Sequence, residues 1–168
     1  RNDPADLYDD LQRIAVMLFP AESRGDPFWF EAARSAFVAI GGYVAETPGL
    51  PLTIGEILHQ MSAAPDLKAH FEKVIAARKS GRLPLSRHCT TALNDFLAAS
   101  ENTMNSVRKT VTARLGLWLN PRIDAATSTN DFDLRELRQR PMSIYLGVTP
   151  DNLDRMAPLL NLFFQQVV

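Results

Sequence analysis

The chain has 168 residues, of which 46% are hydrophobic and 22% charged, with a net charge of −1 and one cysteine. This composition is typical of a globular domain with a substantial core. It excludes an internal disulfide and a global charge that would draw the chain to nucleic acid or membrane. No apolar run reaches the roughly 18 residues of a transmembrane helix. The acidic first ten residues do not resemble a signal peptide. The missing initiator Met is expected either of a piece of a longer protein or of processing.

Six helices are predicted before residue 122, and capping chemistry marks where several of them start. Asp-Pro pairs at residues 3–4 and 26–27 each supply an N-cap and a Pro at the first helical position. Thr53-x-x-Glu56 is a capping box that opens the third helix, and Asn120–Pro121 closes the sixth. The predicted helices cover about residues 4–19, 27–46, 54–61, 66–80, 86–97 and 101–119.

The second predicted helix is apolar on nearly all sides. Phe30, Phe37 and Val44 recur on one face, while Trp29 and Tyr43 lie on another. Its remaining polar stripe is narrow and consists of Glu31, Arg34 and Ser35. Because a helix with so little polar surface must be covered by neighbours, we expect it to be central in a helical bundle.

The character of the sequence changes after residue 121. A polar stretch with one helical turn around Leu134–Leu137 leads to a β-like run, Ser143–Val148. Thr149–Pro150 then starts an apolar helix, which contains Pro158. A strand, a tight turn and an apolar helix form half of a βαβ unit, whose strands belong to parallel sheets. Since no partner strand is present, we expect it in a larger α/β protein. The alternative is that Ser143–Val148 is only an extended arm.

Motifs for catalysis or metal binding are missing. The sequence has no Gly-x-x-x-x-Gly-Lys phosphate-binding loop and no Gly-x-Ser-x-Gly elbow, and close helix packing explains Gly41–Gly42 better than phosphate binding does. The three histidines and Cys89 do not have the spacing of metal ligands. We therefore expect no catalytic residue, no metal site and no enzymatic activity in this chain.

Basic residues gather locally although the whole chain is nearly neutral. Residues 66–88 hold six bases against two acids, whereas residues 1–31 hold seven acids against three bases. Such a surface can bind phosphates or an acidic protein tail. The alternative is that these bases only complement the helix dipoles. The polar residues at the start of the sixth helix could likewise contact phosphate or only cap the helix. The nine candidate residues for binding nucleic acid or protein are Lys68, Lys73, Arg78, Lys79, Arg82, Arg87, Arg108, Lys109 and Arg114.

Three long phrases of the sequence resemble a known family. They are DPFWFEAARSAFVAIGGYVAET, PLTIGEIL and TSTNDFDLRELRQRPMSIYLGVTPDNLDRMAPLLNLFFQQ. Together they resemble the coupling proteins of type IV secretion and conjugation systems, the TraG/TrwB class. The similarity runs through essentially the whole chain and is strongest at residues 26–46 and 131–166.

The resemblance implies a fold and a place in a larger protein. Coupling proteins are ring ATPases anchored in the bacterial inner membrane, with a RecA-like nucleotide-binding domain into which an all-α domain is inserted on the cytoplasmic side. On this basis residues 1–121 are an all-α substrate-recognition domain, a bundle of about six helices. Residues 122–168 are a linker and a strand–helix piece of the RecA-like α/β domain. The parent would bind ATP and Mg, but the Walker A and Walker B motifs match no segment here.

Two functions remain open at this point. The first is recruitment of cargo, meaning a relaxase–DNA complex or an effector protein, with DNA and other secretion components as further partners. The alternative is a structural or oligomerisation element of the ring motor that does not contact cargo. We also expect the tail, residues 142–168, to pack back on the bundle, to self-associate with a second copy, or to be poorly ordered, because the missing sheet would normally cover it.

Overall fold

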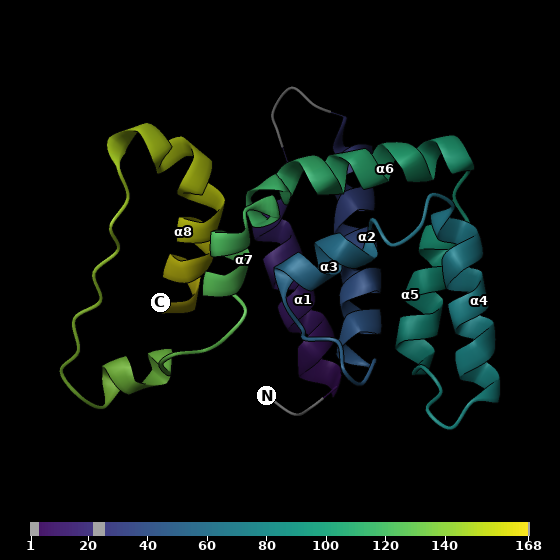
Figure 1. The fold of residues 1–168 in the computed structure, drawn as a ribbon, viewed down its shortest axis with the longest axis horizontal. Coiled ribbons are helices and arrows are strands. Elements are labelled where there is room, and N and C mark those ends of the chain that lie inside the picture. Colours follow the sequence, from purple (N-terminus) through teal and green to yellow (C-terminus); the bar gives the residue numbers. More distant parts are fainter. Residues whose placement is uncertain (1–3, 22–25, 168) are drawn as a thin grey trace.

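The computed structural model describes residues 4–21 and 26–167, and this part of the chain is all-helical, with no strand. None of its helices combines the length and apolar composition that crossing a bilayer requires. The α-helices, shown in Figure 1, are α1 (Pro4–Leu18), α2 (Pro27–Ala45), α3 (Ile54–Gln60), α4 (Leu67–Ser80), α5 (Arg87–Leu97), α6 (Glu101–Arg114), α7 (Pro121–Ala126) and α8 (Leu153–Val167). Short 3-10 turns are η1 (Gly116–Leu119), η2 (Leu134–Arg138) and η3 (Pro150–Asn152).

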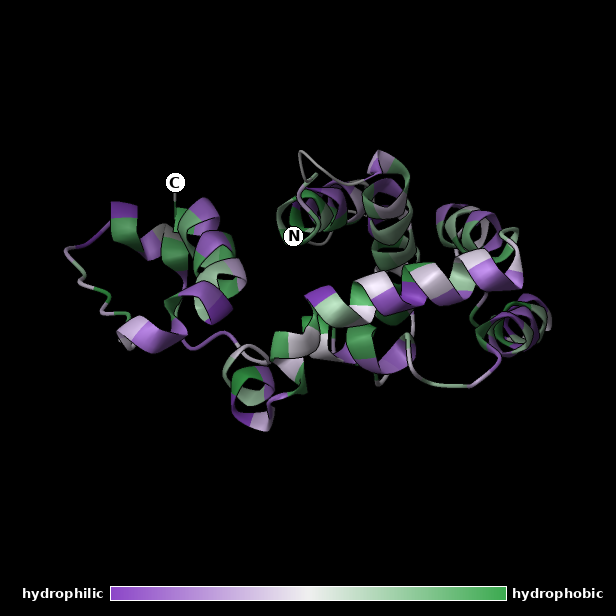
Figure 2. Cartoon of the chain, turned by 90° about the horizontal axis from the view of Figure 1, so that it is seen from above, coloured by the Kyte–Doolittle hydropathy of each residue, from purple (hydrophilic) through white to green (hydrophobic). Residues whose placement is uncertain are grey.

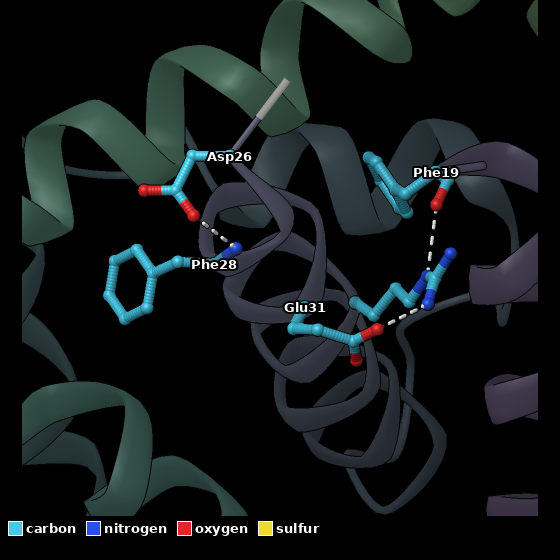
Figure 3. Close-up of polar contacts among 5 residues, drawn as sticks. Phe19, Asp26, Phe28 and Glu31 are labelled. Carbon is cyan, nitrogen blue, oxygen red and sulfur yellow. Dashed lines mark hydrogen bonds and ion pairs between the residues drawn. The ribbon is translucent and has the colours of Figure 1, made fainter. Parts of the chain in front are cut away.

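Side-chain caps fix where the bundle helices begin. Asp26 accepts a hydrogen bond from the Phe28 N–H at 3.0 Å (Figure 3), and Thr53 accepts from the Glu56 N–H at 3.1 Å. Such caps satisfy N–H groups that have no partner within the helix. The same role is filled in α4, α5 and α6 by Asp66, Ser86 and Ser100. The cap predicted at Asp3 lies outside the described residues.

Helix α2 is the centre of the bundle, as its apolar sequence predicts. It packs between α1 and α5, and α6 crosses it (Figures 1 and 2). Phe37, Ile40 and Val44 are fully buried. A side chain at Gly41 would place its Cβ 2.8 Å from Leu11 Cδ2, so this glycine lets α1 approach α2 closely, as the packing interpretation requires.

The predicted sixth helix is shorter than expected, and a further helix follows it. Helix α6 ends at Arg114, and the chain continues through η1 before α7 begins at Pro121. Asn120 accepts a hydrogen bond from the Arg122 N–H at 3.0 Å and Pro121 occupies the first helical position. The Asn-Pro pair was interpreted only as a stop signal, but the same chemistry starts a helix.

The strand predicted over Ser143–Val148 is not formed. Residues 141–149 have no regular secondary structure, and Tyr145 is 91% exposed. A β-strand needs a partner for its backbone hydrogen bonds, and the described residues offer none. The helix after it does form with Pro158 inside, and it packs back on α1 with Leu162 only 4% exposed. The tail is thus an extended arm and a docked helix.

Candidate functional site

The nine predicted binding residues separate into two groups by exposure. Three of them, Arg78, Arg108 and Arg114, are half-buried. The other six are exposed, and their side chains make no hydrogen bond or ion pair with the part of the chain that the structure describes. These six are Lys68, Lys73, Lys79, Arg82, Arg87 and Lys109. This second group presents its cationic groups to solvent, where a ligand can meet them.

The half-buried arginines hold the bundle together. Arg78 Nη2 donates to the Glu46 carbonyl at 2.6 Å, which ties the end of α4 to the end of α2. Arg108 Nη1 donates to the Ala64 and Pro65 carbonyls at 3.1 and 3.3 Å. The Arg114 guanidinium lies 5.6 Å from the centroid of the Phe30 ring, within the range of a cation–π contact. Their role is therefore structural in the first place.

Five of the exposed cations lie on the α4–α5 hairpin, and we call them the basic surface. Lys68, Lys73 and Lys79 lie along α4, Arg82 is in the turn and Arg87 begins α5. At the rise of an α-helix, Lys68 and Lys79 are about 17 Å apart along the axis. The hairpin lies at one end of the molecule, with its turn uncovered by any drawn segment (Figure 1). A ligand can therefore reach the basic surface directly.

A polar cluster around Glu46 fixes this hairpin to the rest of the bundle. Glu46 Oε1 accepts from the Tyr8 hydroxyl at 3.2 Å and from Ser86 Oγ at 2.6 Å, while Oε2 accepts from the Ser86 N–H at 2.6 Å. Tyr8 belongs to α1 and Ser86 caps α5. The Glu46 cluster was not predicted, because its partners lie 38 and 40 residues away in the sequence and follow no local spacing.

The ionisation of two groups beside Glu46 is shifted by their surroundings. Burial, together with the negative charge of Glu46, raises the pKa of the Cys89 thiol to about 12. Burial also raises the pKa of Tyr8 above its usual range. Both groups are therefore neutral at physiological pH, so the Tyr8 hydroxyl keeps the proton that it donates to Glu46. Cys89 is fully buried and acts as a small core residue.

The basic residues of α6 do not gather on one exposed face, although Arg108 lines a pocket together with Lys68 of α4. Arg108 and Arg114 face inward, and only Lys109 is exposed. At the start of the helix, Ser100 Oγ accepts from the Thr103 N–H at 3.2 Å, which is the capping role considered as the alternative. No group of three or more His, Cys, Asp or Glu side chains is placed to hold a metal ion in residues 4–21 and 26–167.

Comparison with known proteins places the chain in a family. The family described as "Type IV secretory system Conjugative DNA transfer" matches residues 1–168. The chain belongs to this conjugative DNA transfer family. The resemblance to coupling proteins of type IV secretion is thereby confirmed.

Individual members of the conjugative DNA transfer family are similar over nearly the whole chain. VirD4 of Rhizobium radiobacter is 30% identical over 166 residues and VirD4 of Agrobacterium fabrum is 30% identical over 171, each covering 98% of this chain. A conjugal transfer protein TraG of Escherichia coli is 22% identical over 167 residues. The aligned region makes up only 23%, 24% and 26% of these three relatives. The chain thus spans about a quarter of their length.

Proposed function

We propose that this chain is the helical domain through which a type IV secretion coupling protein recruits its cargo. Residues 1–121 would recognise the cargo, and residues 122–168 would lead into the nucleotide-binding domain. The observation that carries this proposal is the basic surface, whose five cationic side chains are exposed and have no partner in the described part of the chain. The cargo would be a relaxase–DNA complex or an effector protein, and further secretion components would be partners.

The basic surface is suited to binding an anionic ligand without reorganising the bundle. Its cations lie on a hairpin that the Glu46 cluster holds in place, so little ordering is required when a ligand binds. Phosphate groups and acidic side chains are both recognised by such a surface, and both attractions weaken as salt screens them. The bundle exposes no row of aromatic rings between these cations, so stacking of single-stranded bases contributes little.

The same proposal assigns ATP hydrolysis and its Mg to other parts of the parent protein. It places the parent in the bacterial inner membrane, with this domain on the cytoplasmic face. Purified residues 1–168 are expected to release no phosphate from ATP in a coupled assay, whereas the longer parent protein should do so. Phosphate release by the purified chain at a rate above buffer would contradict this assignment.

The test of recruitment compares variants of the basic surface with a matched control. Lys68, Lys73 and Lys79 are changed together to Gln, and Lys109→Gln serves as the control because it removes an exposed charge outside the hairpin. Binding to labelled single- and double-stranded DNA and to a relaxase is measured by fluorescence anisotropy over a salt series. Each lost phosphate contact should reduce the salt slope by about 0.7–0.9. Undetectable binding to both ligands at low salt would refute recruitment by this surface.

A further inference from the structure

The polar stripe of α2 forms the floor of an open groove between α1 and α5. This groove has a volume of about 390 Å³. Its walls include three apolar side chains, Val16 of α1, Val38 of α2 and Ala92 of α5, and Val16 is 53% exposed. Its two acidic residues, Glu31 of the stripe and Asp95 of α5, are both exposed. The stripe that the otherwise apolar α2 retains is thus explained by a face that no helix covers in the part of the chain that the structure describes.

The groove carries a negative charge that is not paired within the described residues. Arg34 is the one cation that the described residues place in the groove, and it is already engaged: Nε donates to the Phe19 carbonyl at 2.9 Å and Nη1 to Glu31 at 2.6 Å (the unlabelled side chain in Figure 3). Asp95 is exposed and has no partner in the described residues. A ligand that fits the groove therefore combines an apolar side chain with a nearby cation.

The turn of the α4–α5 hairpin carries that combination. Leu83 is 58% exposed in the turn, and Arg82 and Arg87 flank it in the sequence. We call Arg82, Leu83 and Arg87 the tip. The tip cannot reach the groove of its own molecule, since Asp95 lies about 12 Å further along the same rigid helix α5 than Arg87. The two surfaces can meet only between two molecules.

We propose that the tip of one copy docks into the groove between α1 and α5 of a second copy. Leu83 would pack against Val16 and Ala92, and Arg82 would approach Asp95. Because the two surfaces differ, the contact is head-to-tail, and repetition either closes a ring or extends a chain. One turn buries less area than a stable dimer needs, so the isolated chain should associate weakly. This inference does not depend on cargo recruitment.

The test uses one variant of each surface in the intact 168-residue chain. Arg82→Glu damages the tip and Asp95→Arg damages the groove, and both side chains are exposed, so circular dichroism should show unchanged folding. Sedimentation velocity over a concentration series should show self-association of the unchanged chain, weakened about tenfold or more by either variant. Glu72→Arg and Lys109→Glu, exposed charges outside both surfaces, should associate as the unchanged chain does.

Mixing the two variants gives the decisive result. The Asp95→Arg chain retains an intact tip and the Arg82→Glu chain retains an intact groove, and the reversed charges at positions 82 and 95 also attract each other. The mixture should therefore regain the association that each variant alone has lost. An unchanged chain that stays monomeric at every concentration, or a mixture that forms no dimer, would overturn the proposal. The cargo assay separates the two proposals, because Asp95→Arg should bind DNA and relaxase normally. If the unchanged chain is monomeric and only Arg82→Glu loses cargo binding, the tip binds cargo and not a second copy.

Discussion

Replacing Glu46 with Ala tests whether one carboxylate holds the α4–α5 hairpin in place. The substitution removes the acceptor of three hydrogen bonds, one from Tyr8 and two from Ser86. The hydrogen bond from Arg78 persists because it ends on the Glu46 main-chain carbonyl. The variant therefore separates the side-chain contacts from the main-chain contact at the same residue.

The cost follows from the number and surroundings of these bonds. A hydrogen bond to a charged group contributes about 1.5–3 kcal/mol, and a buried donor left without an acceptor costs about 1–3 kcal/mol. Glu46 and Ser86 are only half-buried, so water replaces part of what is lost. We expect the free energy of unfolding to fall by about 2–3 kcal/mol, which lowers the melting temperature of a chain of this size by about 4–12 °C. Glu46→Gln keeps one acceptor oxygen, but its amide group would face the Ser86 N–H with a second donor. The free energy of unfolding of this variant should fall by about 1–2 kcal/mol.

Urea unfolding followed by circular dichroism measures this loss, and Glu72→Ala is the matched control. Glu72 is an exposed glutamate of α4 without a partner in the described residues, so its removal should change stability by less than about 0.5 kcal/mol. The Glu46→Ala chain should also bind cargo more weakly although it keeps every cation, because its hairpin is no longer fixed. If Glu46→Ala unfolds at the same urea concentration as Glu72→Ala, the cluster does not hold the hairpin.

Three further predictions concern the core and the tail. The Cys89 thiol should resist Ellman's reagent at pH 8 until urea is added. The pKa of this thiol is about 12 in the folded state and about 8.5 in the unfolded state, so its contribution to stability should be full below about pH 8.5 and be lost as pH rises toward 12. The Cys89→Ala chain should show a flatter dependence of stability on pH. Gly41→Ala should lose about 1–2 kcal/mol in urea unfolding, since overpacking against Leu11 outweighs the gain in helix propensity. Leu162→Ala should release α8 and speed proteolysis within residues 141–149, whereas Phe164→Ala, at a side chain already 55% exposed, should not.

The helix starts could be predicted because their chemistry is local. A cap such as Thr53 bonds an N–H three residues ahead, so the sequence contains both partners. The central place of α2 was also predictable, because its apolar surface has to be covered on several sides. The stop assigned to Asn120–Pro121 was incomplete: Asn120 does cap the end of η1, but the same two residues also serve as N-cap and first residue of α7.

The strand could not be settled in this way, because a strand depends on its partner. The β-like run over Ser143–Val148 expresses a local preference for extended backbone, and the segment forms neither helix nor strand. A ladder requires a second segment whose position the local pattern does not contain. The helix after it needs no such partner for its backbone hydrogen bonds and so forms in full.

The same distinction between local and non-local information applies to the basic residues. All nine cations can be found in the sequence, but the sequence does not tell which of them are paired inside the bundle. Arg78 donates to the Glu46 carbonyl, whereas its neighbour Lys79 faces solvent. Only the fold shows which positive charges the bundle already uses. On the recruitment proposal, a ligand would be bound by the remaining cations, which have no internal partner in the described residues. Variants of Lys79 should therefore change binding with little effect on stability, and variants of Arg78 should do the reverse.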